Sequence, residues 1–405
     1  MAHHLNIDIE TRSSVDIGKA GMYRYAQSED FRILLFAYRM DNGESEVVDL
    51  ACGEQLPGDI RAALCDPGVI KHAYNAAFEW YCLNRAGYGT PIAQWRCTMV
   101  HGLYCGYTAG LEATGKAIGL PQDKRKLTVG KALIRYFCTP CKPTKSNGGR
   151  RWNEPKHAPE KWALFKEYNR QDVVAEGEIL KRLSLFPVPE EEEKLWQMDV
   201  KMNAFGVRAD RELVTGALAV NGTSEKLLFE EACTLTGLEN PNSAAQLLRW
   251  LEAQETQLPN LQKDTVTDVM AREGLPGRVR RVLEIRQQLG KTSVKKYAAM
   301  LAAAGNDGRI RGLTQFYGAN RTGRWSGRLV QMQNLPRNYL KTLDYARGLV
   351  KAGNYAGVRM LYGNVPDTLS QLIRTAFIPS EGNKFIVADF SAIEARVIAW
   401  LAGEQ

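Results

Sequence analysis

Four acidic side chains and one tyrosine, spread over about 165 residues, have types and spacings suited to metal-assisted chemistry. Asp8 and Glu10 are two residues apart in a predicted strand, so their side chains share one face. Glu79 falls at the start of a predicted helix, and Tyr168 and Asp172, four apart, share one face of a later helix. Carboxylates gathered together repel unless a cation neutralises them, and Mg²⁺ and Mn²⁺ prefer oxygen ligands. The sequence therefore predicts a divalent-ion site, with an exposed strand face as the simpler alternative for Asp8 and Glu10 alone.

The elements that must position these residues indicate an α/β protein. Asp41-Asn-Gly43 lies between two apolar runs and is a strong hairpin signal. Helical spacing dominates from Ala76 onward, which favours helices packed on a mixed sheet. The predicted strands are Leu5–Ile9, Ile33–Tyr38, Glu46–Leu50 and Val69–Tyr74, with a last strand at Lys384–Asp389 before a helix from Ala392.

A domain boundary is expected where Pro187 and Pro189 precede four glutamates, Glu190 to Glu193. The prolines end one helix, and acids in the first turn of the next helix interact favourably with its dipole. We expect a first domain over residues 1–185 and a second over residues 190–405.

The carboxylate pattern resembles the DEDD superfamily of 3′–5′ exonucleases, in the branch with tyrosine in its third motif. The resemblance implies a ribonuclease H-like domain, with a mixed sheet flanked by helices and two divalent ions (Mg²⁺ or Mn²⁺) that promote phosphodiester hydrolysis. It implies Asp8, Glu10 and Asp172 as metal ligands and Tyr168 as the group that orients the attacking water. Glu79 stands where the family usually has aspartate, and its longer side chain can reach a metal directly or through water. Asn75, in the same motif, is either structural or a DNA contact.

Cys138 and Cys141 form a C-x-x-C pair that invites a zinc or redox interpretation. It is the one such pair in the chain, and neither His101 nor His157 completes the spacing of a familiar zinc finger. No thioredoxin-like pattern surrounds it. We therefore expect ordinary thiols and no zinc.

A second group of polar motifs occupies the last hundred residues. Thr322–Arg328 and Gln331–Pro336 combine Gly, Ser, Arg, Gln and Asn, a mixture suited to phosphate and groove contacts on a duplex. Phe385–Arg396 places Asp389 at the end of an apolar run, with Glu394 and Arg396 just after it.

These motifs resemble family-A DNA polymerases of the polymerase I type, in their bacteriophage and prophage members. The resemblance implies a mainly helical thumb and an incomplete palm over residues 190–405. It implies Asp389 as a catalytic metal ligand, Glu394 and Arg374 as nucleotide-binding residues, and four contacts to primer–template DNA. Those contacts are Arg324, Arg328, Gln333 and Asn334.

Two family motifs expected after Asp389 are missing: a helix with Lys and Tyr for the nucleotide triphosphate, and a second palm carboxylate in a His-Asp-Glu context. Arg347 and Lys351 with Tyr362 imitate the first motif but precede Asp389. Because polymerisation requires both features, the chain alone is not expected to polymerise. A truncated polymerase, or a split one completed by a second chain, are both consistent with the sequence, and dNTP binding is expected in a complete polymerase only.

Composition and charge agree with a nucleic-acid partner. The 405 residues carry a formal charge of +8, and Lys116–Lys166 alone holds 13 basic residues against three acids. No membrane-spanning stretch or secretory signal is recognisable, so we expect a protein of the bacterial host cytoplasm that binds DNA. The alternatives are a stand-alone 3′–5′ exonuclease and a DNA-binding protein without catalysis.

Overall fold

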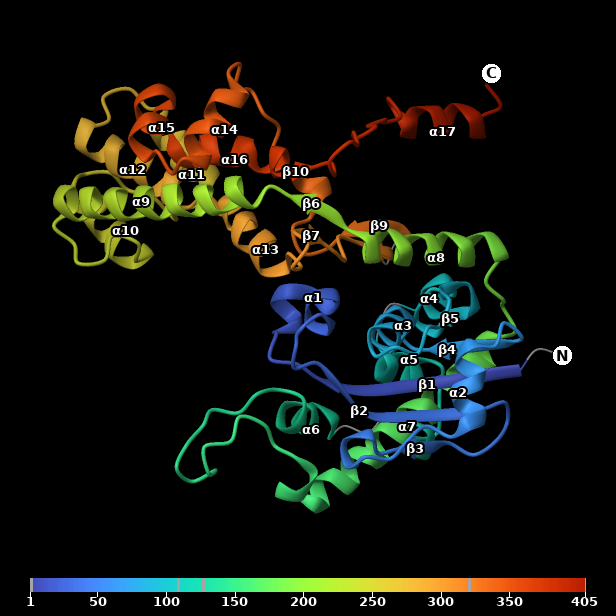
Figure 1. Cartoon of the computed structure of the whole chain (residues 1–405). Helices are drawn as coiled ribbons and strands as arrows, with labels where there is room; N and C mark the ends of the chain where they lie inside the picture. The colour runs from blue at the N-terminus through green and yellow to red at the C-terminus, as the bar shows by residue number, and fades with distance from the viewer. Residues whose placement is uncertain (1–2, 108–109, 126–128, 320–321, 405) are drawn as a thin grey trace.

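A five-stranded mixed sheet organises the first part of the chain (Figure 1). The computed structural model describes residues 3–107, 110–125, 129–319 and 322–404. The strand order is β3-β2-β1-β4-β5, in which β1 runs antiparallel to β2 and parallel to β4. All four strands predicted before residue 75 are confirmed, whereas the three-residue β5 was not predicted. The strands are β1 (His3–Arg12), β2 (Arg32–Met40), β3 (Glu46–Val48), β4 (Val69–Ala73) and β5 (Trp95–Cys97).

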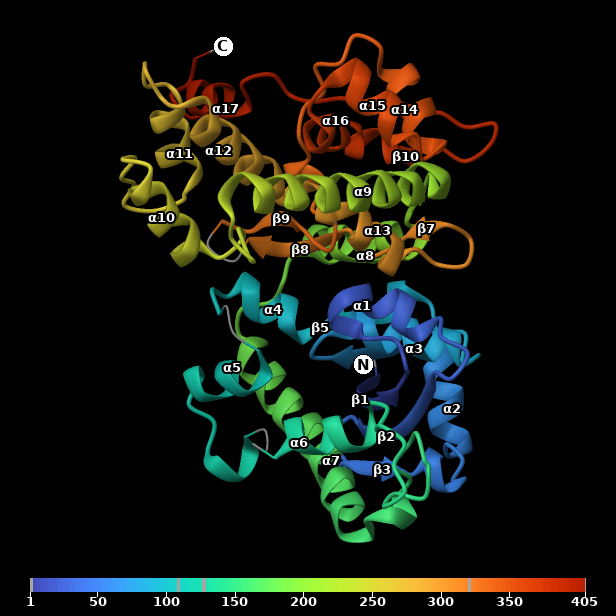
Figure 2. The same ribbon diagram turned by 90° about the vertical axis from the view of Figure 1, so that its left-hand side faces the viewer.

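Helices cover both faces of this sheet, as the α/β prediction requires (Figures 1 and 2). The longest, α7, crosses β1 and β2 and begins with Pro159, which is well suited to a first helical position because it has no N–H to lose. The helices of this part are α1 (Ile17–Ala26), α2 (Gly58–Cys65), α3 (Ala76–Arg85), α4 (Thr98–Tyr104), α5 (Leu111–Ala117), α6 (Gly130–Phe137) and α7 (Pro159–Leu183).

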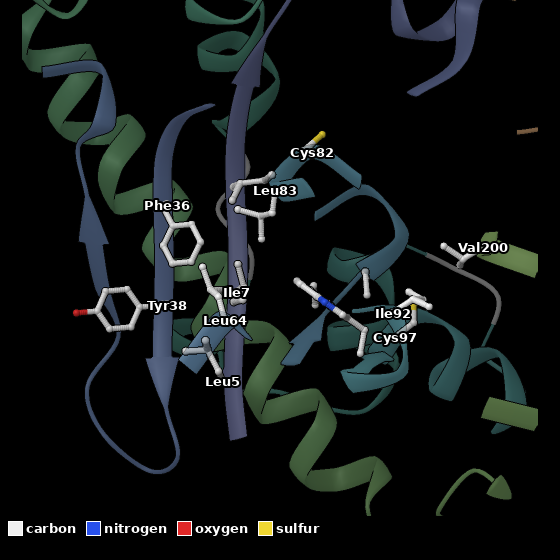
Figure 3. Close-up of a cluster of buried hydrophobic side chains, with 14 of the residues drawn as sticks. Leu5, Ile7, Phe36, Tyr38, Leu64, Cys82, Leu83, Ile92, Cys97 and Val200 are labelled. Atoms are coloured by element: carbon white, nitrogen blue, oxygen red, sulfur yellow. The ribbon is translucent and has the colours of Figure 1, made fainter. Parts of the chain in front are cut away.

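Alternation along β1 separates the core from the polar face of the sheet. Leu5, Ile7 and Ile9 are buried in the main apolar cluster together with side chains of α2 and α3 (Figure 3). The intervening residues Asn6, Asp8 and Glu10 project from the opposite face, which α7 covers. The β1 register therefore fixes which side of the sheet receives the acids.

The second part of the chain is mainly helical, with small sheets. Its apolar core packs α9 against α13, α14 and α16. The helices are α8 (Glu190–Phe205), α9 (Arg211–Thr236), α10 (Ala244–Ala253), α11 (Lys263–Met270), α12 (Gly277–Leu289), α13 (Lys295–Ala303), α14 (Leu343–Lys351), α15 (Tyr355–Tyr362), α16 (Val365–Leu372) and α17 (Ile393–Leu401). The strands are β6 (Val207–Ala209), β7 (Arg309–Ile310), β8 (Thr314–Ala319), β9 (Arg324–Gly327) and β10 (Phe377–Ile378).

Helix α8 joins the two parts and lies between them in both views (Figures 1 and 2). Trp196 and Val200 are buried in the core of the first part, beside Phe316 of β8. On the same helix, Asp199 accepts hydrogen bonds from the Thr314 hydroxyl (2.6 Å) and the Trp325 indole (2.9 Å). One helix thus contributes to both packing units.

The predicted strand at Lys384–Asp389 is wrong. These residues form no ladder with any described strand, and the side chains of Ile386 and Val387 are 88% and 89% exposed. A strand needs a hydrogen-bonding neighbour, and the short β10-β6-β7 sheet does not extend to this segment. The helix after it is confirmed as α17. None of the described helices has the length and apolar character needed to span a bilayer.

Candidate metal centre and nucleic-acid interface

Three of the predicted carboxylates meet at one point. Oxygens of Asp8, Glu10 and Asp172 all lie within 4.8 Å of one another, two from β1 and one from α7. Glu10 and Asp172 are buried, so little water is available to screen their repulsion. A hard divalent cation would remove that repulsion and match an all-oxygen donor set. The residues present therefore fit the divalent ions expected at this place.

Asn169 organises this cluster, and the sequence interpretation missed it. Its Nδ2 donates to Asp8 Oδ2 at 2.6 Å and to the Asp8 carbonyl at 3.2 Å. The side chain is completely buried. A fixed donor on one carboxylate oxygen holds the plane of the carboxylate. Three polar residues, Asn169, Arg170 and Gln171, lie between Tyr168 and Asp172, and a periodicity argument does not single out Asn169 among them.

Tyr168 lies beside the cluster on the same helix as Asp172. Its ring stacks on Phe165, with centroids 6.1 Å apart and planes 14° apart. Burial, followed by the charges of Asp172, Glu10 and Asp8, raises the pKa of the phenol, so the hydroxyl keeps its proton. A Cβ at Gly130 would lie 2.1 Å from this ring, so the start of α6 approaches Tyr168 more closely than any other residue type allows.

Glu79 and Asn75 occupy different environments on α3. Glu79 lies outside the group of three carboxylates, although it is buried, and its Oε2 has no hydrogen-bond partner among the described residues. Burial, then the Asp8 charge, raises the pKa of Glu79 well above its usual range. Asn75 is the exposed N-cap residue of α3 and its side chain makes no cap bond. It lines a cavity of about 1220 Å³ that Arg328 also lines.

The two cysteines of the C-x-x-C pair have separate surroundings. Cys138 is buried with its Sγ 4.0 Å from Glu10 Oε2, and burial, then the Glu10 charge, raises its pKa well above the usual range. Cys141 instead approaches the Arg150 carbonyl at 3.3 Å. Neither belongs to a group of three ligand atoms in the part of the chain that the structure describes.

The predicted DNA contacts gather around the β8–β9 hairpin. Arg324 begins β9 and is exposed, and Arg328 follows that strand with its Nε donating to Gln315 at 2.6 Å. Gln333 and Asn334 are exposed in the 3₁₀ turn Met332–Asn334. A Cβ at Gly327 would lie 2.2 Å from Gln333 Oε1, so this glycine lets the turn pack on the hairpin. All four residues are exposed, and two of them, Arg324 and Arg328, are basic.

The predicted nucleotide-binding residues lie partly beside this surface. Arg374 donates to the Leu335 carbonyl at 3.1 Å, and Glu394 accepts from Arg324 at 3.1 Å. Both side chains of the Arg324–Glu394 pair are more than two-thirds exposed, so the pair adds little stability. Asp389 is exposed in the segment between β10 and α17, and no group of three ligand atoms in the described ranges includes it. The structure does not bring Asp389 to the acids of the first part.

Arg347 and Lys351, whose residue types imitate a nucleotide-binding motif, form ion pairs with a single acid. Both contact Asp210 Oδ2, at 2.9 Å and 2.7 Å, and the Asp210 side chain is 7% exposed. Asp210 in turn caps α9 by accepting from the Leu213 N–H. The two cations therefore attach α14 to the start of α9.

The buried acids have the chemistry to bind divalent ions, and the exposed arginines near the β8–β9 hairpin have the chemistry to bind phosphates. Residues 220–405 match the family model of DNA polymerase family A. This match confirms the resemblance of the second part of the chain to family-A DNA polymerases.

Two similar proteins extend this assignment. A DNA polymerase of Bacillus phage SP02 is 53% identical over 402 residues, which are 99% of this chain and 62% of the relative. The chain thus spans less than two thirds of that relative's length. The solved structure of the POL domain of Pol1 from M. smegmatis, in complex with DNA primer-template and dNTP, has a TM-score of 0.52. Its 17% identity, covering 99% of this chain and 59% of that chain, shows the shared fold alone.

Proposed function

We propose that residues 1–185 are a ribonuclease H-like 3′–5′ exonuclease that removes nucleotides from the 3′ end of DNA. The observation that carries this proposal is the convergence of Asp8, Glu10 and Asp172 beside the buried phenol of Tyr168. Two divalent ions held there would polarise the scissile phosphate and activate water. Asp8, Glu10 and Asp172 would hold these ions, and Glu79 would contribute its buried, unpartnered oxygen.

The chain's own groups do the remaining work in this proposal. The protonated Tyr168 phenol orients the attacking water, which aligns the water with the terminal phosphate. Asn169 fixes the plane of Asp8. Asn75, exposed at the edge of the adjoining cavity, contacts the terminal nucleotide.

Residues 190–405 are proposed to serve a DNA-directed DNA polymerase. The family match supports this, and Arg324, Arg328, Gln333 and Asn334 would bind primer–template DNA. Asp389, Arg374 and Glu394 would serve metal and nucleotide binding.

Incubation with 3′-labelled single-stranded DNA and Mg²⁺ or Mn²⁺ tests the exonuclease. Release of nucleoside monophosphates is expected, and Asp8→Ala should lower the rate by about 10³-fold, because loss of a metal ligand removes several kcal/mol of transition-state stabilisation. Asp16→Ala, a change at the exposed aspartate that caps α1, is the matched control. DNA binding without release in either metal would favour a DNA-binding protein without catalysis.

A further inference from the structure

The segment between α6 and α7 carries a concentration of positive charge that the proposed chemistry does not use. Residues 141–151, here called the basic arm, contain Lys142, Lys145, Arg150 and Arg151 and no acid. In Figure 1 the segment extends away from the sheet, beyond α6. Lys142 and Lys145 are exposed, and none of the ion pairs between described residues includes either of them.

The basic arm has a defined shape, because one side chain connects its two halves. Asn147 Oδ1 accepts from the N–H groups of Thr144 and Gly149, and its Nδ2 donates to the Lys142 carbonyl at 2.9 Å. The Cys141 N–H also donates to the Arg151 carbonyl at 2.8 Å. The lysines are therefore held on an ordered turn, which lowers the entropic cost of binding a ligand.

Both ends of the basic arm are attached next to the carboxylate cluster. Cys138, three residues before the arm, lies against Glu10. Glu154, three residues after it, accepts from Arg12 at 2.7 Å, and Arg12 is two residues beyond Glu10 on β1. Both ends of the basic arm are therefore close to the carboxylate cluster.

We propose that the basic arm binds backbone phosphates of the single-stranded DNA whose 3′ end lies at the carboxylate cluster. This inference rests on the proposed exonuclease function. Exposed lysines on an ordered turn form an electrostatic contact that is independent of sequence, as non-specific single-strand binding requires. The occupant is a polyanionic strand, since the arm offers four cations and no acid.

Binding of a fluorescent single-stranded oligonucleotide, measured by anisotropy without added metal, tests the basic arm directly. Lys142→Ala/Lys145→Ala should weaken binding at least about tenfold at low salt and reduce the slope of log K against log salt by about 1.4, two phosphate contacts of about 0.7 each. Lys181→Ala/Lys226→Ala removes the same charge from exposed positions in α7 and α9. Equal weakening by both double variants, or none by the first, would overturn the proposal.

Kinetic measurements distinguish a wrong proposal for the basic arm from a wrong proposal for the exonuclease. The arm variant should raise KM for single-stranded DNA with kcat unchanged, and it should hydrolyse the p-nitrophenyl ester of thymidine 5′-monophosphate at the parent's rate, since this ester lacks upstream phosphates. A fall in the rate on the ester would mean that the arm supports the cluster itself, which contradicts the proposal. If the parent chain releases no nucleotide, the exonuclease fails while the anisotropy result still decides whether the arm binds the strand.

Discussion

Asn169 and Asp8, 161 residues apart in sequence, are joined by a hydrogen bond of 2.6 Å between Nδ2 and Oδ2. The bond connects α7 to β1 at the point where the three carboxylates converge. Asn169 is therefore a positioning residue in the proposed site, since its hydrogen bond is to Asp8.

Replacing Asn169 should weaken metal binding before it affects folding. Asn169→Ala frees Asp8 to rotate, and loss of such a supporting contact typically costs about 10–100-fold in metal affinity or activity. Mn²⁺ titration by calorimetry should show the weaker affinity, with a similar fall in nucleotide release. The isosteric Asn169→Asp, which adds a like charge, should be at least as harmful.

The control for this prediction is Asn221→Ala, which removes an exposed amide bonded to Glu225 on α9. It should leave Mn²⁺ affinity and nucleotide release unchanged. Unchanged Mn²⁺ affinity in a folded Asn169→Ala protein would contradict the positioning role.

Gly130→Ala should act on Tyr168 through a steric clash. The new methyl group would lie 2.1 Å from the ring, so either the ring or the start of α6 must move. We expect a loss of stability of about 1–3 kcal/mol, typical of overpacking, and a larger proportional loss of nucleotide release than of DNA binding. Denaturant unfolding and 3′-label release measure the two effects.

The matched control is Gly222→Ala on α9, where nothing lies within 4 Å of the new methyl group. That change should stabilise the protein by about 0.5–1 kcal/mol, because alanine is the better helix former. Full activity in a stable Gly130→Ala protein would show that Tyr168 tolerates displacement.

Glu193 should make stability depend on pH. Its side chain is 13% exposed in the first turn of α8, and burial raises its pKa to about 7 despite Arg96 nearby. A carboxyl whose pKa rises on folding contributes stability that is complete below about pH 4.5 and is lost as the pH rises through 7. Glu193→Gln should therefore be more stable than the parent by roughly 1–3 kcal/mol at pH 8 and nearly equal to it at pH 5.

Thermal melts at the two pH values test this prediction. Glu190→Gln, in the same turn but 78% exposed and paired with Lys194, should change stability little at either pH. A Glu193→Gln gain of the same size at pH 5 and pH 8 would argue against a titration effect.

Arg347→Ala should destabilise the second part of the chain. Asp210 would keep Lys351 but lose one of two cations in a buried site, and breaking such a pair costs up to about 3–5 kcal/mol. We expect roughly 2 kcal/mol by denaturant unfolding, since Lys351 compensates in part. Lys226→Ala, from the exposed pair with Glu230, should cost under about 0.5 kcal/mol. Equal losses of stability in the Arg347→Ala and Lys226→Ala proteins would contradict a structural role for Arg347.

Local patterns predicted much of the site. Period-two alternation placed Asp8 and Glu10 on one face of β1, and the four-residue spacing placed Tyr168 and Asp172 on one face of α7. That these two faces meet was implied by the resemblance to the exonucleases and not by spacing, and the structure brings the three carboxylates together. The role of Asn169 was not predicted, because its partner Asp8 lies 161 residues away in the sequence. A hydrogen bond between such distant residues produces no periodic pattern in the sequence.

The errors have the same physical origin. The apolar run before Asp389 has strand-like composition, but a ladder needs a neighbour that local sequence does not reveal. β5 was missed because three residues carry too little pattern. Arg347 and Lys351 were correctly not assigned to the nucleotide-binding motif, because they precede Asp389, but their ion pairs with Asp210 could be seen only in the tertiary structure.

Helix α8 couples the stabilities of the two halves of the molecule. Trp196 and Val200 fill one core, while Asp199 receives hydrogen bonds from Thr314 and Trp325 of the other half. If either half unfolds, one face of this helix becomes exposed. The other half then loses the packing contacts and hydrogen bonds that the helix provided. Thermal unfolding should therefore proceed as one cooperative transition and not as two independent ones.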